Sequence, residues 1–157
     1  MVRDNGMRMV SEQLPLRGKL QAAVEPTPDL MAEILDLSRR RALIPGHGAA
    51  ALHLEQCMDA GAWIDAALAL LEMELPLWQI RRIAYDGGEW YCALSRQREL
   101  PDWLDQSLEA RHSDLALAIL GAFVEAQAAA VSMASTREPS GKPDTDFIWL
   151  CCDNNFA

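Results

Sequence analysis

The sequence is poor in positive charge. It has 14 lysine and arginine residues against 23 aspartate and glutamate residues, which gives a net charge of −9 at pH 7. Nucleic acids and anionic lipid surfaces repel a protein with this balance. The composition therefore argues against non-specific binding to either, and it favours solubility.

Long apolar runs are also missing. A membrane-spanning helix needs about 20 apolar residues, and the longest apolar stretches, 66–71 and 115–124, fall short of that length. The basic residues near the N-terminus are not followed by an apolar run, so no signal peptide is evident. We expect a cytoplasmic protein with no membrane partner.

Cysteine is present, but not in the spacings of metal or redox sites. His53 and Cys57 share one helix face, yet no Cys-x-x-Cys pair completes a tetrahedral zinc site. Cys92 and His112 would be the nucleophile and base of a thiol enzyme. However, the strand neighbours of Cys92 are apolar, and burial makes a thiol inert. We expect no catalytic residues, no metal and no cofactor; a small thiol-dependent enzyme is the third functional alternative.

The chain divides into a flexible N-terminal arm (1–26), a single α+β domain (27–134) and a linker with an apolar tail (135–157). Within the domain, Thr27-Pro28-Asp29 is typical of a helix start, because Thr27 can cap the helix and Pro28 needs no donor there. N-terminal helices are expected over 27–60. The roles of these helices and of the tail are left open.

Residues 62–131 carry the pattern that indicates the fold. Helices are predicted over 62–74 and from Ser113 to about 133, with strands over 77–85, 89–95 and 104–111 between them. Asp86-Gly87-Gly88 between aromatic and β-branched residues is typical of a tight hairpin. The order α-β-β-β-α predicts a small antiparallel three-stranded sheet flanked by helices. The segment 104–111 also allows a helix.

The same segment resembles a family of small phage or prophage proteins that have an α-β-α (ABA) sandwich domain. The resemblance lies in 65–70, the strand beginning at Trp78, the hairpin with Trp90, and 116–119 followed by an alanine-rich helix. It implies a fold and a phage or prophage origin, and no catalytic residues.

The element order also resembles that of double-stranded RNA-binding domains, which use lysines at the start of the last helix to hold phosphates. Here Asp114 stands at that position, and residues 62–131 hold five basic against eleven acidic side chains, 5 − 11 = −6. A nucleic-acid module is therefore the second alternative, with an edge of Arg82, Arg96 and Arg98.

Both predicted helices of this segment are apolar on two faces, so each needs a cover on two sides. One side would meet the sheet, and the other would meet the N-terminal helices or another subunit. The candidate interface residues are therefore Leu117, Leu120 and Val124, together with two tryptophans in weakly patterned regions, Trp103 and Trp149. We expect a non-catalytic accessory protein that binds itself, as a homo-oligomer, or an unidentified protein.

Overall fold

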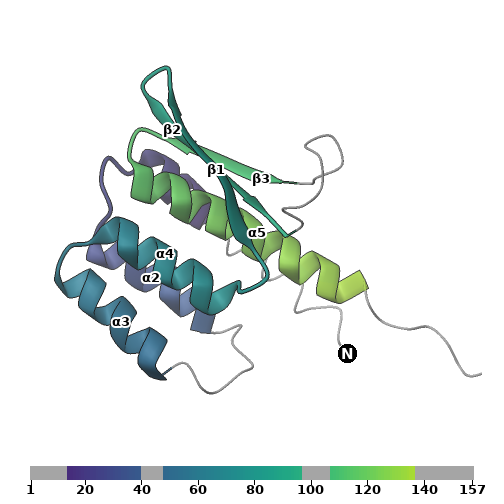
Figure 1. The fold of residues 1–157 in the computed structure, drawn as a ribbon, viewed down its shortest axis with the longest axis horizontal. Coiled ribbons are helices and arrows are strands. Elements are labelled where there is room, and N and C mark those ends of the chain that lie inside the picture. The colour runs from purple at the N-terminus through teal and green to yellow at the C-terminus, as the bar shows by residue number, and fades with distance from the viewer. Residues whose placement is uncertain (1–13, 40–47, 97–106, 137–157) are drawn as a thin grey trace, which may run out of the picture.

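The structure, a computed structural model, describes residues 14–39, 48–96 and 107–136 of the chain. Residues 14–22 are helical. The elements that follow (Figure 1) are the helices α2 (Pro28–Arg39), α3 (Gly48–Asp59) and α4 (Trp63–Glu74), the strands β1 (Gln79–Asp86), β2 (Glu89–Ser95) and β3 (Leu108–His112), and the helix α5 (Leu115–Thr136). The predicted α+β class, with a small sheet flanked by helices, is confirmed.

The sheet is an antiparallel meander in the order β1-β2-β3. Residues 108–112 form a strand at the edge of this sheet, so the helical alternative for 104–111 is wrong over its described part. A register shift between Ile80 and Arg82 marks a bulge in β1. Because a bulge inserts one extra residue, Ile80 and Ile83 both lie opposite residues of the buried face of β2, Leu94 and Cys92.

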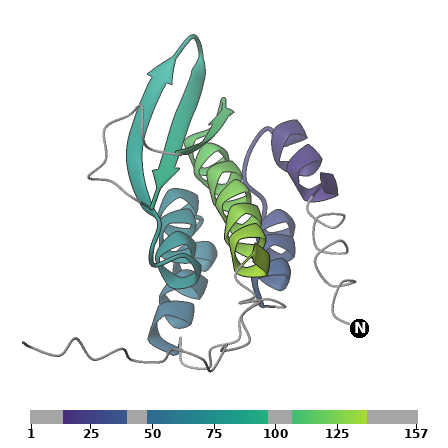
Figure 2. The ribbon, with the colours of Figure 1, turned by 90° about the vertical axis from the view of Figure 1, so that its right-hand side faces the viewer.

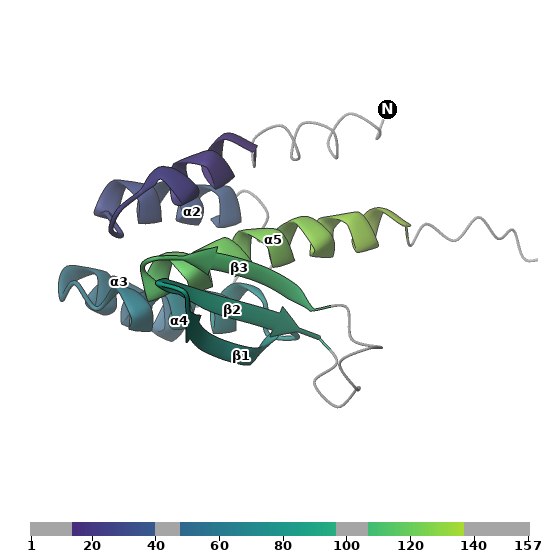
Figure 3. The same ribbon diagram turned by 90° about the horizontal axis from the view of Figure 1, so that it is seen from above.

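α5 is the central element of the fold. One of its faces packs on β2 and β3, and α4 lies beside it (Figures 2 and 3). The approach to β3 is close, because a Cβ atom added at Gly121 would lie 3.1 Å from the Cβ atom of Ala110. The helix is buried on almost every side, with Ile119, Ala122 and Phe123 all fully inaccessible to solvent.

The second face of α5 is covered by the N-terminal helices of the same chain. Gln127 on α5 donates a hydrogen bond of 2.7 Å to Ser38 on α2, in a buried position. Arg17 pairs with Glu125 of α5. The two-faced apolar pattern of this helix is therefore satisfied within one chain.

The predicted interface residues on α5 are for this reason wrong. Leu117 and Leu120 are each 1% exposed, and Val124 is fully buried. All three belong to the hydrophobic core of the chain. The pattern correctly shows that both faces are covered, but periodicity alone does not say which element covers them.

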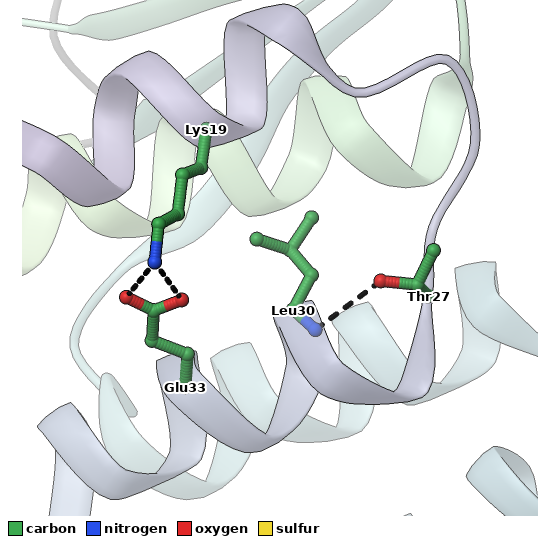
Figure 4. A network of polar contacts seen from close by, with 4 residues as sticks. All are labelled: Lys19, Thr27, Leu30 and Glu33. Carbon is green, nitrogen blue, oxygen red and sulfur yellow. Dashed lines mark hydrogen bonds and ion pairs between the residues drawn. The ribbon is translucent and has the colours of Figure 1, made fainter.

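Residues 14–22 also correct the predicted flexible arm. Leu16 and Leu20, one helical turn apart, are 2% and 3% exposed and belong to the core. Lys19 lies 2.8 Å from the carboxylate of Glu33 on α2, which joins the two helices on their solvent side (Figure 4). This part of the predicted arm belongs to the folded domain.

Side chains cap the N-terminal ends of both α2 and α5. The hydroxyl of Thr27 accepts a hydrogen bond of 3.2 Å from the backbone N–H of Leu30, so the cap of α2 is confirmed (Figure 4). At α5, which the sequence predicts to begin at Ser113, the carboxylate of the next residue, Asp114, accepts the N–H of Leu117 at 3.0 Å and caps the helix. The N–H of Asp114 donates a hydrogen bond of 2.9 Å to Nδ1 of His112, at the connection between β3 and the helix.

Candidate interaction surface

The hairpin of β1 and β2 is closed by a two-residue turn. Gly87 and Gly88 have φ values of +61° and +90°, which are those of a type I′ turn. Residues that carry a side chain disfavour positive φ values, whereas glycine adopts them readily. The twist of a type I′ turn matches the twist of the two strands that it joins. The turn places Asp86 opposite Glu89 and Tyr85 opposite Trp90.

The helices cover the inner face of the sheet unevenly. Along β1 the exposed fraction rises from 6% at Trp78, just before the strand, to 39% at Ile83 and 60% at Tyr85. Figure 1 shows the reason, since the hairpin extends away from α4 toward its tip. α5 packs on β2 and β3, whereas among the described residues no helix packs as closely on β1.

The uncovered end of this face is aromatic and aliphatic. The rings of Tyr85 and Trp90 lie with centroids 5.0 Å apart and planes tilted by 55°, within the usual range for favourable aromatic pairs. Ile83 lies on the same face, two residues before Tyr85. We call Ile83, Tyr85 and Trp90 the hairpin patch. It is an apolar surface on the inner side of the sheet that the described helices leave partly open to solvent.

The outer face of the sheet is polar and centred on Tyr91. The guanidinium groups of Arg82 and Arg111 lie 5.9 and 5.3 Å from the centre of its ring, which allows cation–π attraction from two sides. Burial, a hydrogen bond to Glu109 and the charge of that carboxylate raise the pKa of Tyr91 to about 12, although both arginines oppose the shift. The hydroxyl therefore stays protonated at neutral pH.

A shallow pocket of about 280 Å³ surrounds this tyrosine, and Asp86 and Glu89 also line it. The two arginines thus share the pocket with two carboxylates. A flat aromatic ring with flanking arginines is suited to stacking against another planar group. The neighbouring carboxylates reduce its attraction for phosphate.

A larger groove, of about 470 Å³, runs between the helical segment 14–22, β3 and α5. Two of its charged side chains have partners in the chain, since the terminal guanidinium nitrogen of Arg17 pairs with Glu125, and Glu109 bonds to Tyr91; the Nε atom of Arg17 is buried without a hydrogen-bond partner among the described residues. His112 accepts a hydrogen bond of 2.9 Å from the N–H of Asp114 at Nδ1. The groove therefore holds a histidine that shapes the chain, without a nucleophile beside it.

The structure does not bring the predicted basic edge together. Arg82 lies on the outer face beside Tyr91, whereas Arg96 reaches the sulfur of Met133 on α5 at 3.1 Å. The side chains of Arg82 and Arg96 therefore lie on different surfaces and do not form one basic edge. Arg98 lies outside the described residues, as do the candidate interface residues Trp103 and Trp149.

Sequence reasoning missed Tyr85, Tyr91 and Arg111 as candidate surface residues. A usable signal was present for one of them. A two-residue turn at Gly87-Gly88 fixes Tyr85 directly opposite Trp90, so this aromatic pair can be read from the sequence once the turn is recognised. The position of Arg111 beside Tyr91 depends on the register of β3, which no short turn defines.

Among the described residues, neither Cys92 nor Cys57 lies in the arrangement that a thiol enzyme or a metal site requires. Cys92 is fully buried, and burial raises the pKa of its thiol to about 11, which disfavours the reactive thiolate. It pairs across the sheet with Ala110, and His112 pairs with Trp90. The sulfur of Cys57 lies 3.7 Å from His53, but no group of three or more potential ligands occurs within 14–39, 48–96 and 107–136.

α5 is longer than the apolar run that the sequence suggests. Over Leu115–Met133 it has the length and composition of a membrane span, and it is the one helix of the described chain that does. In this fold it is the core helix, with 56% of the segment buried. The core helix of a soluble domain meets the same criteria, so this finding is weak evidence for a membrane.

Comparison with family models, with curated proteins and with solved structures found no match for this chain.

Proposed function

We propose that this chain is a non-catalytic interaction protein that associates with itself, and that the hairpin patch is its contact surface. The observation that carries the proposal is the loss of cover along β1, from a buried Trp78 to a Tyr85 that is 60% exposed. Exposed aromatic residues beside aliphatic ones are typical of protein interfaces. The resemblance to prophage proteins supports a phage or prophage origin, and the composition supports a cytoplasmic location.

The chemistry of the described residues supports a non-catalytic role. The most deeply buried thiol, that of Cys92, has a raised pKa, and His112 is engaged by the backbone at the start of α5. In the groove between the helical segment 14–22, β3 and α5, Arg17 forms an ion pair with Glu125. These groups stabilise the fold and leave no activated nucleophile among themselves.

The chain contains its own matched control. Its two tyrosines stand on opposite faces of the same hairpin, Tyr85 in the hairpin patch and Tyr91 on the outer face. Size-exclusion chromatography with light scattering would measure the mass of the wild type, Tyr85→Ala and Tyr91→Ala. We expect Tyr85→Ala to shift the protein toward monomer and Tyr91→Ala to leave its mass unchanged. A wild type that stays monomeric at all concentrations would remove the proposal.

A specific observation also favours a second candidate function, nucleic-acid binding on the outer face. Tyr91 between Arg82 and Arg111 offers a ring for base stacking with positive charge on both sides. Against it stand Asp86 and Glu89 in the same pocket and the net charge of −9. A gel shift with single-stranded RNA and DNA at low salt tests it. Binding that Tyr91→Ala weakens would support this function, and no shift at low salt would exclude it.

A further inference from the structure

We infer that the partner at the hairpin patch is a second copy of this chain, and that the two β1 strands pair antiparallel about a two-fold axis at Ala84. The inference rests on the proposed function, because it specifies how the chain associates with itself. It predicts a continuous six-stranded sheet, three strands from each copy.

In the part of the chain that the structure describes, β1 is an edge strand and can accept this pairing. It is the first strand in the order β1-β2-β3, and Figure 3 shows it at the margin of the sheet. Among the described residues, no strand continues the sheet beyond it. An edge strand presents unpaired backbone donors and acceptors that another strand can bind. A second β1 strand is a suitable occupant, because a two-fold axis makes any antiparallel pairing self-complementary.

The turn determines which backbone groups point outward. In a hairpin with a two-residue turn, the residues on either side of the turn, here Asp86 and Glu89, exchange backbone hydrogen bonds. Backbone groups alternate in direction along a strand. The N–H and C=O groups of Asp86 and Ala84 therefore point toward β2, and those of Tyr85 and Ile83 point toward the free edge.

A pairing centred on Ala84 uses these groups and matches the side chains. Ile83 then lies opposite Tyr85 of the partner subunit, and both present outward backbone groups to each other. Directly opposite residues share one face of a sheet. The two hairpin patches therefore meet on the inner face, as aromatic and β-branched pairs that stabilise antiparallel strands.

Charge selects this register over its neighbours. On the outer face, the Ala84-centred pairing places Arg82 opposite Asp86 of the partner subunit. A centre at Arg82 would place two arginines directly opposite each other, which is destabilising. A centre at Ile83 or Tyr85 would place Arg82 opposite an alanine or a glycine. Among the described residues, neither Arg82 nor Asp86 forms an ion pair within its own chain, although Arg82 lies over the ring of Tyr91.

A charge swap tests the register. Arg82→Glu and Asp86→Arg each place like charges at two symmetry-related contacts, so each should raise the dimer dissociation constant by roughly 100-fold. The double variant restores opposite charges at both contacts and should recover most of the affinity. Arg111→Glu is the matched control, because this arginine also lies beside Tyr91 but on β3, away from the β1 edge. Sedimentation equilibrium would measure the dissociation constants, with thermal melting to confirm that each variant folds.

The outcomes separate this inference from the proposed function. If the wild type associates and Tyr85→Ala weakens it, but the charge swap does not restore what single reversals remove, the register is wrong and self-association stands. If single reversals have no more effect than Arg111→Glu, the β1 pairing is wrong. If the wild type is monomeric, the proposed function fails, and the bulge and arginines of β1 act to protect an edge.

Discussion

The helical segment 14–22 offers a sharp test of the fold, because it contains buried and exposed leucines in one helix. Leu16 and Leu20 are 2% and 3% exposed, whereas Leu14 is 68% exposed. Truncating a buried leucine to alanine costs about 2–5 kcal/mol, from lost apolar contact and the cavity left behind. Truncating an exposed one changes stability by about 0.5 kcal/mol or less. The substitution is chemically identical at all three positions, so helix propensity affects each of them in the same direction.

We expect Leu16→Ala and Leu20→Ala each to lower the free energy of unfolding by about 3 kcal/mol. With a urea dependence near 2 kcal/mol per molar, that loss shifts the unfolding midpoint by about 1.5 M. Leu14→Ala should leave the midpoint nearly unchanged. Urea titration followed by circular dichroism measures all three. Equal midpoints for Leu14→Ala and Leu16→Ala would refute the packing of this segment on α5 and return it to a loose arm.

Further predictions concern the caps, the buried amide and the thiol. Because Asp114 caps α5, Asp114→Ala should destabilise the protein by about 1 kcal/mol in urea titration, and the neighbouring Ser113→Ala should not. A larger loss of stability for Ser113→Ala than for Asp114→Ala would contradict the assigned cap. Gln127→Leu should lower the free energy of unfolding by about 1–3 kcal/mol, since it leaves the buried hydroxyl of Ser38 without this donor. An unchanged free energy of unfolding would show that the hydrogen bond contributes little. Cys92 should be alkylated far more slowly in the folded protein at pH 9 than in urea, because burial raises its thiol pKa to about 11 and keeps it protonated below that pH; equal labelling by mass spectrometry in both states would contradict its burial.

Local signals in the sequence predict the hairpin and the order of its elements. Asp86-Gly87-Gly88 indicates a turn, because glycine accepts the positive φ that a type I′ turn needs, and the turn in turn fixes the pairing of Tyr85 with Trp90. The cap at Thr27 is local in the same sense, since its hydroxyl acts on the N–H three residues later.

The remaining features depend on tertiary packing. Leu16 and Leu20 are the buried pair of residues 14–22. Two apolar residues are too few to predict a helix from periodicity. The helix is stabilised by its packing on α5 and α2. Leu117, Leu120 and Val124 show that α5 is covered on two faces, but the identity of the covering helices follows only from the fold. The loss of cover along β1 is likewise invisible in the sequence, because Ile83 and Tyr85 follow the same alternation as buried strand residues.

Light scattering of the wild type at increasing concentration, beside Tyr85→Ala and Tyr91→Ala, tests self-association through the hairpin patch most directly. The account predicts that the wild type and Tyr91→Ala approach twice the chain mass of 17.4 kDa, and that Tyr85→Ala remains nearer to a single chain. A wild type that keeps the mass of one chain throughout, or a Tyr85→Ala variant that associates as strongly as the wild type, would contradict it.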